Sequence, residues 1–214
     1  MTEVYIVRHC ESEANVNRSF AGRTDVDISE KGKLQLDCLA EYFKNIKINK
    51  IYSSPLIRAR KTADAINKYN SAPIIIDERL IEMNLGVLDG KPVDEMTPIQ
   101  KDTWNNAPHL FSVEKGETMA EVAKRAKEAF FEIIKENQGK IVISSHGCFI
   151  RNLMRILIGL GEEELSLVPW NDNTGITHII YDGNIKIDFV NYTNHLSEEA
   201  KSKPVSSWTK EDSK

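Results

Sequence analysis

Four side chains in this sequence have the chemistry needed to bind and transfer a phosphoryl group. They are two arginines and two histidines, namely Arg8, His9, Arg58 and His146. Arginine presents a planar fork of donors that matches phosphate oxygens, and an unprotonated imidazole can attack phosphorus to form a phosphohistidine. Gathered in one pocket, these side chains could bind a phosphate dianion and stabilise the transition state of phosphoryl transfer without a metal ion.

A fifth residue, Glu82, could supply the proton that a leaving alcohol needs. It lies at the border of a stretch rich in glycine and proline. Taken singly, such residues are more often structural: a satisfied buried histidine, a surface arginine in an ion pair, or a solvated carboxylate. The catalytic interpretation therefore depends on a fold that brings all five together.

The phosphate-binding candidates each follow a short apolar run of strand length. Four such runs occur, at Val4–Val7, Ile51–Ser53, Ile74–Ile76 and Ile141–Ile143. Runs that are apolar on both faces are typical of strands buried in a parallel sheet. In open α/β sheets, ligands bind outside the carboxyl ends of the strands, where helix amino termini add donors. We therefore expect the candidates to meet at one edge of a sheet.

Helical patterns separate the strands. Ser29 can cap one helix, and Thr118 with Glu121 forms a capping box ahead of another. Two further helices are expected, one over Ala59–Tyr69 after Pro55 and one over Phe149–Ile158 that stops at Gly159. Two late strands, Thr177–Tyr181 and Ile185–Val190, are joined by a turn at Asp182-Gly183. This alternation predicts an α/β fold, a three-layer α/β/α sandwich with a mostly parallel central sheet.

The length of 214 residues predicts one domain. We assign it to residues 1–200, with an irregular insertion at about 84–116 that we expect to act as a lid. Within it, Trp104 and Phe111 either line the mouth of a substrate pocket or pack the lid itself. Residues 201–214 form a polar tail without periodicity, in which Trp208 either docks on the domain or has no role.

Charge and composition exclude several classes of protein. The chain has 28 Lys and Arg against 32 Asp and Glu, a net charge of −4, which argues against a nucleic-acid-binding protein. No apolar run approaches the ~18 residues of a membrane span. The three cysteines, Cys10, Cys38 and Cys148, cannot all pair and show no CxxC spacing, so we expect a cytoplasmic location. The sequence does not determine the oligomeric state, and a homodimer is possible.

Other phosphate- and metal-handling motifs do not fit. The segment Gly86–Pro92 is one residue short of a P-loop and ends in proline. Neither Cys10 nor Cys148 has the spacing to an arginine that a cysteine phosphatase needs. Asp25 and Asp27 match the DxD of aspartyl phosphatases, but no buried strand precedes them. Neither an HExxH motif nor a readable cluster of metal ligands occurs, so we expect no metal site.

The motifs around the candidate residues occur in a characteristic order across about residues 4–150. They are Val7-Arg8-His9-Cys10-Glu11-Ser12 with Asn15, Gly22-Arg23-Thr24-Asp25, Ile28-Ser29-Glu30-Lys31-Gly32, Ser53-Ser54-Pro55-Leu56-Ile57-Arg58-Ala59, Leu80-Ile81-Glu82 and Ser145-His146-Gly147. With this ordered set, the sequence resembles the histidine phosphatase superfamily in its phosphoglycerate-mutase-like branch.

The resemblance implies a role for each matching residue. His9 would be the phosphorylated nucleophile, and Glu82 would protonate the leaving oxygen and later activate water. The phosphoryl oxygens would be held by Arg8, Asn15, Arg58 and His146. A phosphatase of this kind would need neither a metal nor an organic cofactor.

The sequence also departs from the family pattern. Cys10 stands where glycine is usual, so its side chain could crowd the pocket or make activity sensitive to oxidation. Ala21 replaces a frequent glutamine, which removes one pocket contact. True mutases carry extra arginines after the acidic residue, whereas Met83-Asn84-Leu85 follows Glu82 here. The lack of these cations favours hydrolysis over isomerisation.

The sequence thus predicts a metal-independent phosphomonoesterase that hydrolyses a small phosphorylated metabolite through a phosphohistidine intermediate. The resemblance leaves the substrate itself open. Two alternatives remain: a cofactor-dependent phosphoglycerate mutase, and a catalytically silent binding protein on the same fold. We expect no nucleic-acid or membrane partner.

Overall fold

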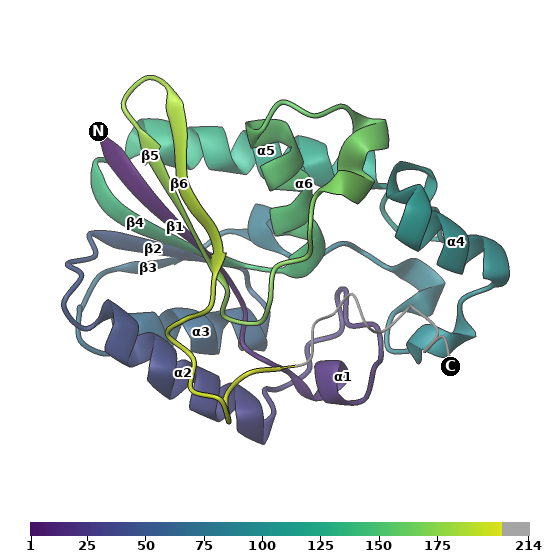
Figure 1. Ribbon diagram of the computed structural model, residues 1–214, viewed down its shortest axis with the longest axis horizontal. Helices are drawn as coiled ribbons and strands as arrows, with labels where there is room; N and C mark the ends of the chain where they lie inside the picture. The colour runs from purple at the N-terminus through teal and green to yellow at the C-terminus, as the bar shows by residue number, and fades with distance from the viewer. Residues whose placement is uncertain (203–214) are drawn as a thin grey trace.

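A six-stranded sheet forms the centre of the molecule (Figure 1). The computed structural model describes residues 1–202 of the chain. The strands are β1 (Thr2–Arg8), β2 (Lys50–Ser53), β3 (Ile74–Ile76), β4 (Gly139–Ser145), β5 (Ile176–Tyr181) and β6 (Ile185–Tyr192). All six were predicted from the sequence, and several extend a few residues beyond the predicted bounds.

The strand order is β3-β2-β4-β1-β5-β6. β1 is parallel to β4, β4 to β2 and β2 to β3, whereas β5 runs antiparallel to both of its neighbours. The sheet is therefore mostly parallel, as predicted. In this register Arg8 lies opposite Ser145, and Ser53 lies opposite Ser144. The carboxyl ends of the three central strands β1, β2 and β4 thus share one edge of the sheet.

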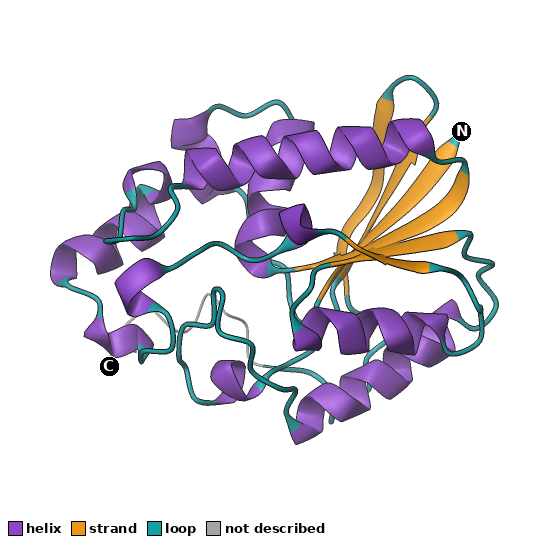
Figure 2. Cartoon of the chain, turned by 180° about the vertical axis from the view of Figure 1, so that it is seen from behind, coloured by secondary structure: helices purple, strands orange, loops and turns teal. Residues whose placement is uncertain are grey.

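Helices cover both faces of the sheet. The α-helices are α1 (Glu13–Val16), α2 (Glu30–Phe43), α3 (Ile57–Asn67), α4 (Pro98–Asn106), α5 (Met119–Glu136) and α6 (Gly147–Leu157). Helices α2 and α3 lie on one face and α5 and α6 on the other, as Figure 1 and the rear view in Figure 2 show. This arrangement confirms the predicted three-layer α/β/α sandwich.

Alternate side chains of β1 enter the two apolar layers of the core. Val4 and Ile6 belong to the buried cluster that contains the apolar side chains of α5 and α6. Tyr5 and Val7 belong to a second cluster with Leu39 and other residues of α2 and α3. Because successive residues of a strand face opposite sides, the apolar run at Val4–Val7 fills both layers.

The helix starts follow from capping residues that the sequence contains. The Ser29 hydroxyl accepts a hydrogen bond from the Gly32 backbone N–H at the start of α2, and the box of Thr118 and Glu121 starts α5. Helix α3 begins and ends two residues earlier than predicted. It begins directly after the extended Leu56, and it ends where the Asn67 side chain turns to bond the backbone of Ala72.

The segment 84–116 is more regular than predicted. Helix α4 has Pro98 in its first turn and a capping box of Thr97 and Gln100, signals that the sequence analysis did not use. Within residues 1–202 there are also five 3₁₀ helices, η1 (Glu78–Leu80), η2 (Gly86–Leu88), η3 (Val93–Glu95), η4 (Pro108–Leu110) and the longer η5 (Glu162–Leu167). The apolar side chains of the segment form a third buried cluster that also contains Phe20 and Cys148.

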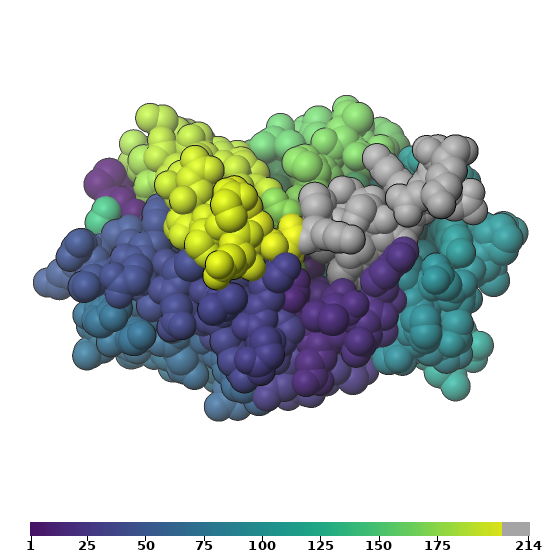
Figure 3. All heavy atoms as spheres, turned by 60° about the horizontal axis from the view of Figure 1, so that its bottom comes forward, coloured from purple at the N-terminus to yellow at the C-terminus, as the bar shows by residue number. Residues whose placement is uncertain are grey.

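The chain after β6 returns across α2. In Figure 3 the yellow end of the described chain lies against the blue residues of α2. The Gln35 amide donates hydrogen bonds to the carbonyl of Ala200 and the hydroxyl of Ser202, and that hydroxyl donates to Glu11. The first two residues of the predicted tail are therefore held against the body, and the rest of it, with Trp208, lies outside the described residues.

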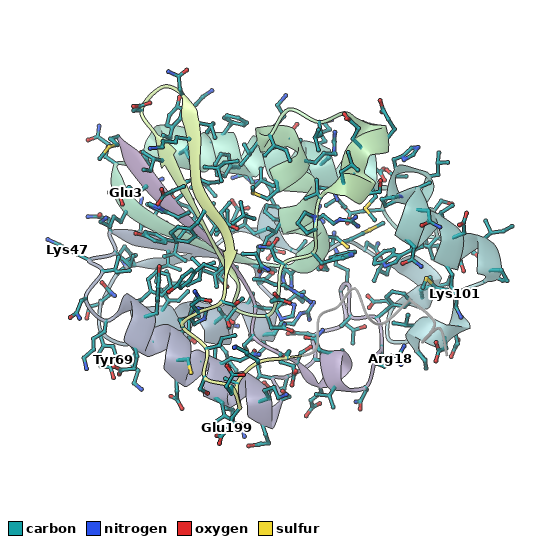
Figure 4. The ribbon with its side chains drawn as sticks, viewed as in Figure 1. Glu3, Arg18, Lys47, Tyr69, Lys101 and Glu199 are labelled. Carbon is teal, nitrogen blue, oxygen red and sulfur yellow. The ribbon has the colours of Figure 1, made fainter. Side chains whose placement is uncertain are left out.

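The long axis of the molecule runs from the loops at the amino-terminal edge of the parallel strands to the 84–116 segment. In Figure 4 the labelled side chain of Lys47, between α2 and β2, marks one end, and that of Lys101, in α4, marks the other. The carboxyl ends of the parallel strands lie between them and face the 84–116 segment (Figure 1).

Candidate active site

His9 lies one residue beyond β1, at the edge where the parallel strands end. Its backbone N–H donates to the Ser145 carbonyl at 2.9 Å, which fixes it beside the end of β4. Its Nδ1 lies 2.7 Å from the carbonyl oxygen of Cys10. Because a carbonyl oxygen can only accept, Nδ1 carries the proton and Nε2 keeps its lone pair.

His146 follows β4 and caps the amino terminus of α6. Its ring centroid lies 5.1 Å from that of His9, with the ring planes inclined at 51°. Its Nε2 lies 2.7 Å from the Ser54 hydroxyl, and its buried Nδ1 has no hydrogen-bond partner among the described residues. The second histidine is therefore beside the first, with one ring nitrogen held and the other free.

Burial and positive charge keep both imidazoles neutral. Burial lowers the pKa of His9 well below its usual value, and the Arg58 and Arg8 guanidinium groups lower it further. Burial, Arg58 and the neighbouring His9 lower the pKa of His146 in the same way. At neutral pH both rings are uncharged, which is the form that can attack an electrophile or donate a single N–H.

Arg8 is the last residue of β1 and is almost wholly buried. Its Nη1 donates to the Asn171 carbonyl at 2.5 Å, while its Nε is buried with no partner in the described chain. Gly147 allows the close approach around it, because a Cβ at that glycine would lie 3.3 Å from the Trp170 ring and 3.6 Å from the Arg8 Nε. The guanidinium thus keeps donor capacity for a ligand.

Arg58 comes from the first turn of α3 and is buried. Its guanidinium donates to three backbone carbonyls of the loop before Asp25, those of Ala21, Gly22 and Thr24, at 2.7, 3.2 and 3.0 Å. Burial lowers the pKa of Arg58 to about 10, so the side chain stays charged at neutral pH. The loop therefore fixes the orientation of a buried cation.

Glu82 lies in the loop after η1, with its carboxylate at the amino terminus of α6. The carboxylate accepts hydrogen bonds from the backbone N–H groups of Met83, Cys148 and Phe149, at 2.8, 3.1 and 3.3 Å. The N–H groups of a helix start favour an acidic side chain there. These contacts place the carboxylate at the first turn of the helix that His146 precedes.

Asn15 lies in the single turn of α1. Its side-chain oxygen accepts hydrogen bonds from the backbone and hydroxyl of Ser12 and from the Asn173 amide. The Asn173 amide also donates to the carbonyl of His9. Asn15 is therefore connected to the backbone that carries His9.

One pocket of about 630 Å³, including solvent at its mouth, brings these residues together. Of the predicted site residues, it is lined by Arg8, His9, Asn15, Arg58 and Glu82. His146 is not part of this lining, but its ring lies next to that of His9. The outer wall is apolar and aromatic, with Phe20, Leu85, Val93, Trp104 and Trp170. Trp104 thus lines the pocket, whereas the buried Phe111 packs against the Trp104 ring at 4.8 Å.

Two of the departures from the family pattern, Cys10 and Ala21, have different consequences for the pocket. Cys10 is fully buried, and its backbone N–H donates to the Thr62 hydroxyl. It is not among the described residues that line the pocket, so it does not crowd it. Ala21 does line the pocket, and its backbone carbonyl holds Arg58.

Two further residues shape the site and were missed by the sequence analysis. The Asp89 carboxylate accepts from the backbone N–H groups of Gly22, Arg23 and Thr24, and so holds the loop that orients Arg58. Trp170 stacks on Trp104 with ring centroids 5.5 Å apart. Both contacts join segments far apart in sequence, so no local spacing signals them.

Within residues 1–202, no group of three or more His, Cys, Asp or Glu side chains is arranged so that it could hold a metal ion. In the same part of the chain, no helix has the length and apolar character needed to cross a membrane.

Comparison with known proteins extends these observations. The family model of the histidine phosphatase superfamily (branch 1) matches residues 4–193. The chain is 35% identical over 189 residues to a Hydrogenobacter thermophilus protein provisionally named phosphoserine phosphatase 2, covering 86% of this chain and 91% of that protein. It is 32% identical over 165 residues to an Escherichia fergusonii protein provisionally named phosphoglycerate mutase GpmB, covering 75% and 76%.

Among solved structures, YhfR of Bacillus stearothermophilus superposes with a TM-score of 0.87 at 32% identity, covering 92% of this chain and all of that one. The similarity thus extends over the strand ends and helix starts that carry the paired histidines. From its sequence, its fold and this match over nearly its whole length, the chain belongs to the histidine phosphatase superfamily.

Proposed function

We propose that this chain is a metal-independent phosphomonoesterase that hydrolyses a small phosphorylated metabolite through a phosphohistidine on His9. The observation that carries the proposal is the His9 ring itself. Its Nδ1 is tied to a carbonyl, its Nε2 lone pair is free, and two arginines lie in the same pocket. An unprotonated imidazole next to an anion-binding site is the arrangement that nucleophilic attack on a phosphate ester needs.

In the first step, the His9 Nε2 attacks phosphorus and the bond from phosphorus to the ester oxygen breaks. If the Ser54 hydroxyl donates to the Nε2 of His146, its Nδ1 carries the proton, and Arg8, Arg58 and this N–H stabilise the charge on the phosphoryl oxygens. Asn15 provides an auxiliary contact. Glu82 donates a proton to the leaving alkoxide, so the alcohol departs neutral. The products of this step are the alcohol and phosphohistidine, with Glu82 as carboxylate.

In the second step, Glu82 takes a proton from water as that water attacks phosphorus. The bond from phosphorus to Nε2 breaks and returns its electron pair to the imidazole, which releases inorganic phosphate. The neutral state of the imidazole favours the first step, because a ring protonated on both nitrogens has no lone pair with which to attack phosphorus.

Hydrolysis rather than isomerisation is supported by the charges in the pocket. Of the described residues that line it, only Arg8 and Arg58 are permanently cationic. A mutase must hold and reorient a bisphosphate, which needs further cations. The match to a relative named as a phosphoglycerate mutase makes that activity the second candidate.

The relatives and the pocket size support the proposed substrate class. A relative named as a phosphoserine phosphatase suggests a phosphorylated metabolite of few atoms, which the pocket can accommodate. We also propose that residues 1–200 work as one domain, with the 84–116 segment as its lid, because Leu85, Val93 and Trp104 from this segment line the pocket.

The test is the His9→Ala variant with 4-nitrophenyl phosphate as substrate. We expect its turnover to fall at least about 10³-fold, because the nucleophile is lost. When the wild type is mixed with a phosphomonoester radiolabelled at phosphorus and the reaction is stopped by denaturation, a labelled phosphoenzyme should be recovered. Its label should be labile in acid and stable in alkali, and the variant should lack it. His109→Ala, which changes a histidine outside the pocket lining, is the matched control and should keep wild-type activity.

Two further measurements separate the alternatives. Incubation with 3-phosphoglycerate should release inorganic phosphate, whereas interconversion of its isomers would identify a mutase. A wild type that turns over no phosphomonoester would identify a silent binding protein. Activity that EDTA abolishes and a divalent ion restores would overturn the metal-independent mechanism.

A further inference from the structure

Arg125, in the middle of α5, makes an unusual set of contacts with the loop that carries Glu82. Its Nη1 donates to the carbonyls of Arg79 and Ile81, at 2.9 and 2.5 Å, and its Nη2 donates to the carbonyl of Glu82 at 3.1 Å. Three carbonyls within four residues are thus held by one guanidinium. Helix α5 therefore fixes the backbone of the loop that carries Glu82.

Glu117, just before the amino terminus of α5, completes this arrangement. Its carboxylate accepts from the Nε and Nη2 of Arg125, at 2.9 and 3.1 Å, and from the backbone N–H of Asn84 at 2.7 Å. It also accepts from Arg23, in the loop that orients Arg58. The Glu117 carboxylate thus joins three segments around the pocket.

Among the described residues, this is the most buried ion pair that an arginine or lysine makes. The side chains of Arg125 and Glu117 are only 15% and 19% exposed. Burial raises the pKa of Glu117, but hydrogen bonds from Arg125 and the Asn84 backbone outweigh it and leave the pKa lowered. By contrast, the nearby Arg79 side chain pairs with Asp77 and the half-exposed Glu132 and reaches no residue of the pocket.

Glu82 is consequently held from two sides. Its carboxylate bonds the first turn of α6, and its backbone carbonyl bonds Arg125 of α5. Without Arg125, the carbonyls of the loop would lose these donors. The Glu82 carboxylate would then be held only by the first turn of α6 and by the backbone N–H of Met83. Displacement of a catalytic group by about 1 Å can reduce a rate by 10²-fold.

We propose that the pair of Arg125 and Glu117 is a positioning device that fixes Glu82 for proton transfer to the leaving group. The inference rests on the proposed function, because it assigns Glu82 the acid role. Arg125 and Glu117 act through Glu82 and touch no reacting atom.

The test compares a poor and a good leaving group, which differ in how much they need the acid. Against an alkyl ester such as β-glycerol phosphate, we expect Arg125→Met to lose about 10- to 100-fold in kcat/KM. Against 4-nitrophenyl phosphate, whose leaving group departs with little proton transfer, the loss should stay within about 3-fold. The ratio of the two rates is the readout, because a general loss of folded protein would lower both equally.

Arg79→Met is the matched control, since it removes an arginine of the same region that pairs away from the pocket, and its ratio should equal that of the wild type. If Arg125→Met does not fold, Arg125→Lys and Glu117→Gln serve instead and should move the ratio in the same direction. Glu82→Gln supplies the reference. If it changes the ratio and the Arg125 and Glu117 variants do not, the positioning role is wrong. If Glu82→Gln itself leaves the ratio unchanged, the acid role fails and this inference falls with it.

Discussion

His9 owes both its protonation state and its tautomer to its neighbours. Burial and the guanidinium groups of Arg58 and Arg8 keep the ring neutral, and the Cys10 carbonyl holds the proton on Nδ1. The same two cations that lower the pKa of the ring would bind the phosphate that it attacks. A single arrangement of charge would thus serve both the proposed nucleophile and the anion that it attacks.

Cys10 leads to a prediction at the same scale. Burial raises its pKa to about 12, and burial together with Glu82 raises the pKa of Cys148 well above its usual value. Since the thiolate is the reactive form, iodoacetamide at pH 8 should label neither residue in the folded enzyme and should leave activity intact. Mass spectrometry of the peptides measures this, with urea-unfolded protein as the fully reactive control.

Rapid labelling of Cys10 with matching loss of activity would contradict that prediction. It would instead support the oxidation sensitivity that the sequence suggested for this position. Cys38, half-buried in α2, provides an internal comparison within the same experiment.

At the scale of elements, the sequence predicted what local patterns encode. Apolar runs gave the strands, and caps such as Ser29 gave helix starts, because these signals lie within a few residues of each other. Helix α4 was missed because the surrounding prolines and glycines suggested a loop. The contacts of Asp89 and Arg125 could not be predicted, since they are made with backbone groups of distant segments and leave no spacing pattern.

The loop over residues 21–24 yields a prediction for one such contact. Asp89→Ala removes the acceptor of three backbone N–H groups and should loosen the loop whose carbonyls orient Arg58. We expect the free energy of unfolding to fall by about 1–2 kcal/mol and kcat/KM to fall about 10-fold on all phosphomonoesters. Urea titration and initial rates measure both effects.

Asp94→Ala changes an exposed carboxylate of the same segment and serves as the control. Because Asp89 acts through Arg58, the proposed phosphate ligand, its loss should affect alkyl and aryl esters alike. A selective loss on alkyl esters would show that the loop acts on Glu82 instead.

At the scale of the whole molecule, the pocket is assembled from segments that only the complete sheet brings together. Arg8 and His9 come from β1, Arg58 from α3, Glu82 from the loop after η1, and His146 from the start of α6. The turn before β5 also contributes, because the Thr174 N–H donates to the Arg8 carbonyl. The site therefore exists only in the folded chain, and the cost of burying its titratable groups is a property of folding.

That cost predicts how stability depends on pH. The pKa values of His9, His146 and His195 are lowered mainly by burial, that of His195 to about 4, whereas in the unfolded chain each lies near 6.5. Below pH 6.5 the unfolded chain therefore binds protons that the folded chain does not. The free energy of unfolding should fall with pH from 6.5 downwards, by up to about 1.4 kcal/mol per pH unit for each histidine.

His195 allows this linkage to be tested outside the pocket. Its ring packs against Tyr42 and Tyr192, so His195→Phe preserves a ring while removing one titrating group. Urea unfolding between pH 7.5 and 4.5 gives the change in the free energy of unfolding with pH. For this variant the slope should be shallower, by an amount equivalent to the uptake of up to one proton. Carboxylates with lowered pKa, such as Asp77, lose their stabilising pairs only at lower pH and affect both proteins equally. An unchanged slope would mean that His195 is already protonated in the folded enzyme, and that burial does not hold its imidazole neutral.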